Sequence, residues 1–238
     1  MKKNSRKPAP GGKKEADKDQ DRKKILLIDD HPMMRAGLAQ LINRQPDMCV
    51  CAEAGQPSEV FTLFSRVQPD LVLTDLTMPG RGGLEFIKDL IALRSDLPIL
   101  VISMHDEAVY AERCLRAGAR GYIMKESGSE NLLAALRSVI AGQRYVSPGV
   151  SESILRNLSA KKPRGSDSPI QALSDREFEI FQEVGRGKST REIAEQLHLS
   201  PKTVDVHRAH IKEKLGLKDV TALVRYAVRW LETQIPTT

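Results

Sequence analysis

The 238-residue sequence has little that would suit a membrane, secreted or cysteine-ligated metal protein. No stretch approaches the roughly 20 consecutive apolar residues of a membrane span. The N-terminus lacks the apolar core of a signal peptide. The three cysteines are odd in number and have neither the CxxC nor the paired His/Cys spacing of zinc sites. These absences predict a cytoplasmic protein, kept in a reducing compartment, with no membrane partner.

Excess positive charge is confined to the N-terminus. The formal net charge is +6, and residues 1–24 hold ten Lys or Arg against four Asp or Glu, so the remainder sums to zero. Residues 1–22 have almost no apolar content, which predicts a disordered basic tail. Two interpretations stay open for it: a solvated leader, or a nonspecific anchor for nucleic acid or another acidic partner.

Beyond the tail, short apolar runs alternate with segments of helical periodicity. This alternation predicts an α/β domain over 23–142, with a parallel sheet covered by helices on both faces. The apolar runs are 24–28, 48–54, 70–74, 98–102 and 121–124, and the helical segments are 32–45, 57–67, 83–94, 106–117 and 128–142.

A linker over 143–170 precedes a second, all-helical domain over 171–238. The linker contains a short helical segment, 151–158, and the tether Lys161–Pro169, which has two prolines, a glycine and no apolar residue. Ser174 with Glu177 forms a capping-box pattern, and Ser200 followed by proline predicts another helix start. The four predicted helices are 174–185, 189–197, 201–214 and 218–232.

Side chains that can carry chemistry end four of the five apolar runs. Asp29 and Asp30 follow the first run, Asp75 the third, Ser103 the fourth and Lys125 the fifth. The carboxyl ends of parallel strands line one edge of a sheet, so we expect these side chains to converge. Each residue alone has an ordinary structural explanation, but their joint placement predicts a site.

The three carboxylates of this site would repel one another unless a cation neutralised them, and an all-oxygen ligand set suits Mg²⁺. One carboxylate could then attack phosphorus. The ion and Lys125 would balance the phosphoryl charge, and the Ser103 hydroxyl would donate a hydrogen bond. The expected product is an aspartyl phosphate. The sequence has no P-loop or GxGxxG motif that would indicate a rival chemistry.

Four segments resemble the receiver domains of two-component systems: KILLIDDHPMMRAGL, DLVLTDLTMPGRGGLE, PILVISMHD and GARGYIMKE. The resemblance covers about residues 24–142 and implies a flavodoxin-like (βα)5 fold with strand order 2-1-3-4-5. It implies that Asp29, Asp30, Asp75 and the Thr77 carbonyl bind Mg²⁺. It also implies that Asp75 is the phosphoacceptor, with Ser103 and Lys125 at the phosphoryl group. Tyr122 lies at the aromatic switch position of the family.

The C-terminal part contains a helix-turn-helix pattern, in which a basic second helix has the right width for the major groove of DNA. Residues 170–235 resemble the LuxR-type DNA-binding domain, a small four-helix unit. A receiver joined to this domain is the architecture of the NarL/FixJ response regulators. The candidate DNA contacts are Lys202, Thr203, Asp205, Val206, His207, Arg208, Ala209, His210 and Lys212.

Three residues of this second helix have more specific interpretations. Asp205 is either an acceptor from a cytosine N4 group or a helix-cap partner in the first turn. His207 and His210 are interpreted as contacts to the DNA backbone or phosphates rather than as metal ligands, because no third ligand lies near them in the sequence.

The predicted function is a phosphorylation-controlled, DNA-binding transcriptional regulator rather than an enzyme. A sensor histidine kinase would phosphorylate Asp75, and this would switch homodimerisation and binding to inverted-repeat half-sites. One alternative is a regulator whose receiver works without phosphorylation. The other is an aspartyl-nucleophile phosphatase, but the haloacid-dehalogenase pattern has a second aspartate two residues after the nucleophile, where this chain has Thr77.

Overall fold

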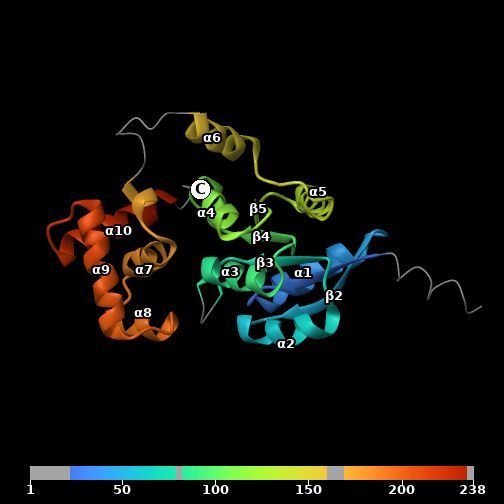
Figure 1. The fold of residues 1–238 in the computed structure, drawn as a ribbon, viewed down its shortest axis with the longest axis horizontal. Helices are drawn as coiled ribbons and strands as arrows, with labels where there is room; N and C mark the ends of the chain where they lie inside the picture. Colours follow the sequence, from blue (N-terminus) through green and yellow to red (C-terminus); the bar gives the residue numbers. More distant parts are fainter. Residues whose placement is uncertain (1–21, 79–81, 160–168, 235–238) are drawn as a thin grey trace, which may run out of the picture.

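The computed structural model describes residues 22–78, 82–159 and 169–234 (Figure 1). An α/β domain forms the first part of the chain and a group of helices forms the last part. Five strands make up a parallel sheet in the order β2-β1-β3-β4-β5, which confirms the flavodoxin-like topology. The strands are β1 (Lys23–Ile28), β2 (Met48–Ala54), β3 (Leu71–Asp75), β4 (Ile99–Ser103) and β5 (Gly121–Met124).

Helices cover both faces of the sheet, as the continuous apolar runs predicted. Helices α1 and α5 pack with Ile25 and Leu27 on one face, while α2, α3 and α4 pack with Leu26 and Ile28 on the other. All four of these side chains are fully buried, which stabilises the fold by roughly 1.5–3 kcal/mol each. The helices are α1 (Pro32–Asn43), α2 (Pro57–Val67), α3 (Gly83–Leu93), α4 (Glu107–Ala117) and α5 (Ser129–Ile140).

Two strands are shifted by one residue from the predicted runs. Strand β3 begins at Leu71, and Asp70 flanks it, with its carboxylate accepting a hydrogen bond from the backbone N–H of Lys24 at 2.7 Å. At the other end, Asp75 pairs with Ile102 within the ladder, and β4 likewise includes Ser103. Asp75 and Ser103 are therefore the last residues of their strands, whereas Asp29 and Lys125 directly follow theirs.

The predicted tail and tether lie largely outside the described residues, which omit 1–21 and 160–168. Arg22 is an exception at the boundary of the tail. Its guanidinium donates to the carbonyl oxygens of Asn43 at 2.9 Å and Met48 at 2.6 Å. Arg22 therefore belongs to the folded domain, and the prediction of disorder up to residue 22 extended one residue too far.

Between the two domains, helix α6 (Pro148–Ser159) packs against α4, with Val150 buried (Figure 1). It is longer than the predicted 151–158. Ahead of α6, Tyr145 forms an isolated bridge with Gly121 of β5. None of the helices within the described ranges is long and apolar enough to cross a membrane.

The last part of the chain contains the four predicted helices. The capping box is present: the Glu177 carboxylate accepts from the Ser174 N–H at 2.7 Å. Ser200 caps the third of these helices, accepting from the Thr203 N–H at 3.0 Å. The elements are a 3-10 turn η1 (Pro169–Ala172), α7 (Asp175–Gly185), α8 (Thr190–Gln196), α9 (Pro201–Leu215) and α10 (Val220–Gln234).

Removing residues 1–21 while keeping Arg22 separates the two interpretations of the basic tail. We expect the melting temperature to stay within error, because the segment has almost no apolar residues to bury. If the tail binds nucleic acid, its removal should make the slope of log affinity against log salt shallower, since fewer counterions are released. DNA titrations at several salt concentrations measure this slope, and an unchanged slope would leave only the solvated leader.

Candidate functional site

The charged side chains predicted from the sequence meet at the carboxyl edge of the sheet. Asp75 ends β3 and Asp29 directly follows β1, and both are buried, with 2% and 0% of their surface exposed. Lys125, directly after β5, places its Nζ 2.8 Å from Asp29 Oδ2 and 2.7 Å from Asp75 Oδ2. One ammonium group therefore bridges two buried carboxyl groups.

Burial and ion pairing act in opposite directions on these groups. Burial alone would lower the pKa of Lys125, but its hydrogen bonds to Asp29 and Asp75 outweigh this and raise the pKa, so the ammonium form is favoured. For Asp75, burial raises the pKa, and the contacts with Lys125 only partly oppose it. The pocket therefore holds a fixed positive charge beside a carboxyl group that is shielded from water.

Asp30 and His31 complete an acidic pocket. One possible ligand atom from each of Asp29, Asp30, His31 and Asp75 lies within 4.8 Å of the others. The His31 ring places its Nδ1 2.7 Å from Asp30 Oδ1, and its backbone N–H donates to Asp29 Oδ1 at 2.8 Å. Three carboxylates around one point fit a hard divalent cation such as Mg²⁺. Sequence reasoning missed His31, although it directly follows the aspartate pair.

Ser103 and Tyr122 both form hydrogen bonds with His105, a residue that sequence reasoning missed. Ser103 is fully buried, and its Oγ accepts from the His105 N–H at 3.1 Å. The buried Tyr122 donates its hydroxyl to the His105 carbonyl oxygen at 2.8 Å. Thr77 donates its backbone N–H to Asp75 Oδ1 at 3.1 Å, and its Oγ1 lies 2.8 Å from His105 Nε2. Thr77 therefore connects the His105 ring to the Asp75 carboxylate.

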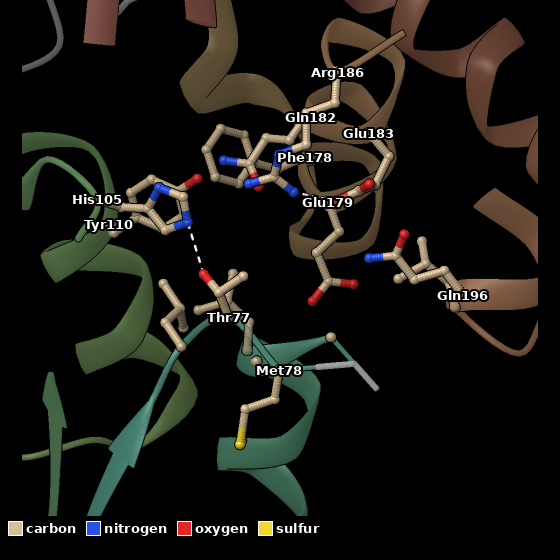
Figure 2. Close-up of a pocket in the computed structure, with 15 residues that line it drawn as sticks. Thr77, Met78, His105, Tyr110, Phe178, Glu179, Gln182, Glu183, Arg186 and Gln196 are labelled. Atoms are coloured by element: carbon tan, nitrogen blue, oxygen red, sulfur yellow. Dashed lines mark hydrogen bonds and ion pairs between the residues drawn. The ribbon is translucent and has the colours of Figure 1, made fainter. Parts of the chain in front are cut away.

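The His105 ring continues this path toward the second domain. It stacks on Tyr110 of α4 with 4.6 Å between ring centroids, and Tyr110 meets Phe178 of α7 edge to face at 5.2 Å (Figure 2). Burial, followed by the positive charge of Arg186, lowers the pKa of His105 to about 4. The ring is therefore neutral at physiological pH and can sit between two domains at little electrostatic cost.

Arg113 of α4 is the main polar link between the domains. Its guanidinium donates to the carbonyl oxygens of Ile170 at 2.7 Å and Leu173 at 3.0 Å. It also lies over the Phe178 ring, 4.2 Å from the centroid, and 3.4 Å from the Asp175 carboxylate. A planar guanidinium makes all of these contacts at once, which an ammonium group could not do.

In the second domain the structure overturns one interpretation of Asp205. Ser200 is the N-cap of α9, so Asp205 lies beyond the first turn and cannot cap the helix. Its Oδ1 instead accepts from the Thr190 hydroxyl of α8 at 3.2 Å, and Arg208 donates to the same hydroxyl at 2.7 Å. Asp205 therefore helps to fix the angle between the two helices of the motif.

The remaining candidate DNA contacts divide into an exposed strip and its flanks. Val204 and Ile211 anchor α9 in the core. Thr203 is engaged by Ser200, with 2.7 Å between their hydroxyl oxygens. Thr203, His207, Arg208 and Lys212 are only partly exposed. The exposed strip consists of Lys202, Asp205, Val206, Ala209 and His210.

The fold and the pocket are those of a receiver domain, and α7–α10 form a helix-turn-helix domain. Two family models match the chain in the same places. The response regulator receiver domain matches residues 25–137, and the luxR family of bacterial regulatory proteins matches residues 171–227.

Whole-length relatives share both parts. The chain is 36% identical over 210 residues to the oxygen regulatory protein NreC of Staphylococcus carnosus, covering 87% of this chain and 97% of that protein. It is 35% identical over 206 residues to the response regulator GacA of Pseudomonas aeruginosa, covering 87% and 95%. The structure of RcsB from Salmonella enterica serovar Typhimurium, bound to promoter DNA with phosphomimetic BeF3⁻, shares the fold, with a TM-score of 0.67 at 24% identity over 87% and 99% of the two chains.

These likenesses place the chain among DNA-binding transcription regulators rather than enzymes. The chain belongs to the NarL/FixJ-type two-component response regulators, which join a receiver domain to a LuxR-type helix-turn-helix domain.

Replacing Arg113 tests the interface between the domains. Arg113→Ala leaves two backbone carbonyls without their donor, which should weaken the interface by roughly 1–3 kcal/mol. Hydrogen exchange of residues 169–175 should therefore speed up by about tenfold or more. Arg116→Ala is the matched control, because Arg116 lies on the same helix and pairs with Glu112, one turn away on that helix. Equal exchange in Arg113→Ala and the parent protein would show that the contact does not hold the domains together.

Proposed function

We propose that this regulator is switched by phosphorylation of Asp75 by a sensor histidine kinase. The observation that supports the proposal is the placement of Lys125 between two buried carboxyl groups, Asp29 and Asp75, at the carboxyl edge of the sheet. A structural ion pair would need one carboxylate, whereas a phosphoacceptor site needs a second acidic group for a cation and a lysine for the transferred group.

The same pocket would hold Mg²⁺ through Asp29, Asp30, Asp75 and the Thr77 carbonyl. When bound, the ion supplies positive charge that offsets the phosphoryl oxygens and the carboxylates. A carboxylate oxygen of Asp75 attacks the phosphorus of the donor, and the bond from phosphorus to the donor nitrogen breaks. Lys125 then turns its ammonium group from Asp75 to a phosphoryl oxygen, and the Ser103 hydroxyl donates to another.

The switch would act through the series of contacts that leads from Asp75, by way of His105 and Tyr110, to α7. A phosphoryl group that engages Ser103 and Lys125 changes the surroundings of His105, which bonds to Ser103 and Thr77. His105 in turn stacks on Tyr110 at the domain interface. Phosphorylation shifts the protein only if it stabilises one arrangement of this interface over another. The favoured state would be a homodimer whose α9 helices bind inverted-repeat half-sites in the major groove.

The proposal also covers the domain boundaries and the location of the protein in the cell. We assign residues 23–142 to the receiver, 143–170 to the linker and 171–238 to the DNA-binding domain, and place the protein in the cytoplasm. The acidic pocket with its bridging lysine argues against a receiver that works without phosphorylation. Thr77 occupies the position where the phosphatase alternative has its second aspartate.

A small-molecule phosphodonor with Mg²⁺ should add one phosphoryl group to the protein, and Asp75→Asn should abolish the addition because the amide is not a nucleophile. Intact mass measurement detects the group directly. Chelation of Mg²⁺ should suppress labelling in the parent protein. Asp96→Asn, at an exposed aspartate on the same domain, is the matched control and should be labelled normally. Undiminished labelling of the Asp75 variant would reject the site.

Alanine variants of Asp205 and Lys202, both on the exposed strip of α9, should change DNA binding in different ways. If Asp205 accepts from a base, Asp205→Ala relaxes the preference at one base pair per half-site, costing roughly 1–3 kcal/mol on the preferred sequence. Lys202→Ala should instead weaken all sequences alike and reduce the salt slope by about one unit if it touches phosphate. Selection from a random DNA pool distinguishes the two patterns.

Asp205→Asn serves as the control for that experiment, because an amide oxygen can still accept from Thr190 and hold α8 against α9. If Asp205→Ala leaves the selected motif unaltered while lowering the stability of the domain, Asp205 has only the packing role.

A further inference from the structure

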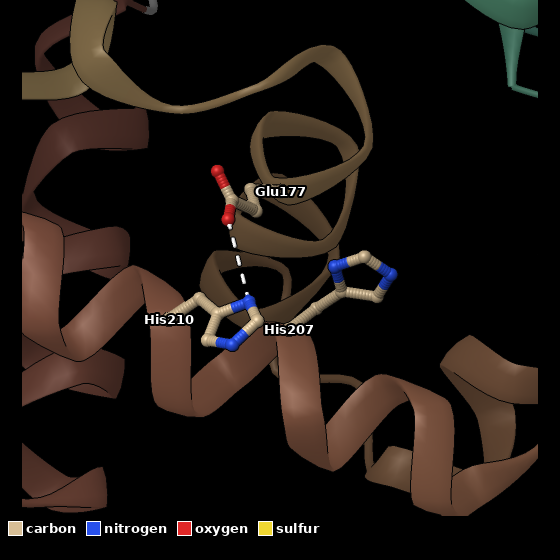
Figure 3. Close-up of side chains that lie close together, drawn as sticks. All are labelled: Glu177, His207 and His210. Carbon is tan, nitrogen blue, oxygen red and sulfur yellow. Dashed lines mark ion pairs between the residues drawn. The ribbon is translucent and has the colours of Figure 1, made fainter.

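A cluster of metal-ligating side chains lies in the second domain, away from the receiver pocket. His207 and His210 are three residues apart on α9 and so project from the same side of the helix. No third ligand is near them in the sequence, but the fold provides one in Glu177 of α7 (Figure 3). One possible ligand atom from each of the three residues lies within 4.8 Å of the other two.

The two oxygens of Glu177 have different surroundings. Oε2 is held by the Ser174 N–H at 2.7 Å and by the Lys214 ammonium at 2.6 Å. An oxygen on the other side of the carboxylate, Oε1, faces His210 Nδ1 at 3.8 Å, beyond hydrogen-bond distance (Figure 3). The carboxylate is therefore oriented by two donors on one oxygen while the other oxygen is directed at an imidazole.

His207 contributes a ring nitrogen that lacks a partner. Its Nδ1 is buried and has no hydrogen-bond partner within the described part of the chain. A buried polar atom without a partner is costly, and a bound ion would satisfy it. Burial lowers the pKa of His207, although the Glu177 carboxylate opposes this shift, and a lowered pKa favours the neutral ring that a metal ligand must have.

We propose that Glu177, His207 and His210 form a binding site for a transition-metal ion, with Zn²⁺ as the best fit. Two imidazoles and one carboxylate are a ligand set that zinc accepts in tetrahedral sites, with the fourth position left to water. Imidazole ligands disfavour Mg²⁺, which prefers oxygen. The His210 ring is exposed, which leaves it room to turn toward an ion shared with Glu177 and His207. The Lys214 ammonium on Oε2 opposes the ion, so binding is weaker than at a closed four-ligand site.

An ion at this position would affect α9, the helix that carries the candidate DNA contacts. It would tie α9 to α7 and occupy His207 and His210, two of the candidate DNA contacts, so metal binding should weaken DNA binding. This consequence rests on the proposed function, whereas the binding of the metal itself does not. The two can therefore fail separately.

Titration of the full chain with Zn²⁺ in excess Mg²⁺ tests the site by calorimetry. The excess Mg²⁺ competes for the receiver carboxylates, and any Zn²⁺ that still enters that pocket is identified by its loss in Asp30→Asn. Beyond any ion in the receiver pocket, we expect one Zn²⁺ ion to bind per chain. Its affinity should fall about tenfold or more in His207→Ala and in His210→Ala. His198→Ala is the matched control, because His198 is exposed in the turn before α9, and it should leave this affinity unchanged.

Substituting Co²⁺ provides a second readout, because a four-coordinate nitrogen and oxygen site gives visible absorption bands that the two histidine variants should lose. Circular dichroism confirms that each variant is folded. The proposal is overturned if the folded parent protein binds no ion other than the one lost in Asp30→Asn, or if His207→Ala and His210→Ala bind Zn²⁺ as tightly as the parent does.

Discussion

The structure of the receiver depends on one buried charge cluster, the Lys125 ammonium between Asp29 and Asp75. Removing one member of a buried ion pair leaves an uncompensated charge, which typically costs about 3–5 kcal/mol. The three residues come from the ends of β5, β1 and β3, so the cluster forms only when these strands are parallel and in the observed register. In the proposed function, a negative group transferred to Asp75 would therefore draw the Lys125 ammonium away from this carboxylate.

The contact between the domains combines backbone groups that are satisfied by a receiver side chain with a buried apolar cluster that extends over both domains. The carbonyls of Ile170 and Leu173 precede α7 and find their donors in Arg113, a residue of the receiver. The Lys88–Asp175 ion pair at 2.9 Å and the successive ring contacts of His105, Tyr110 and Phe178 add polar and aromatic contacts to this interface. Among these three rings, the neutral ring of His105 lies nearest to Asp75.

Much of the fold and the receiver site was predictable from local patterns. Apolar runs that end in Asp, Ser or Lys indicate both the strands and the edge at which those side chains meet, and the strand order followed from the family resemblance. His105, Arg113 and Glu177 were not predictable as members of sites, because their partners come from distant segments. Asp205 was assigned partly to a cap because first-turn acids favour the helix dipole, but it lies five residues beyond Ser200, outside that turn.

Helix α7 connects these observations, because adjacent residues on it face different neighbours. Phe178 meets Tyr110 and Arg113 of the receiver, while Glu177, rotated by roughly 100° around the helix, bonds to Lys214 and faces His210 of α9. Both residues lie on one capped helix, so a displacement of α7 at Phe178 would also displace Glu177. Helix α9 is therefore held by the same element that contacts the receiver, and in the proposed function a change at the domain interface would reach α9 through α7.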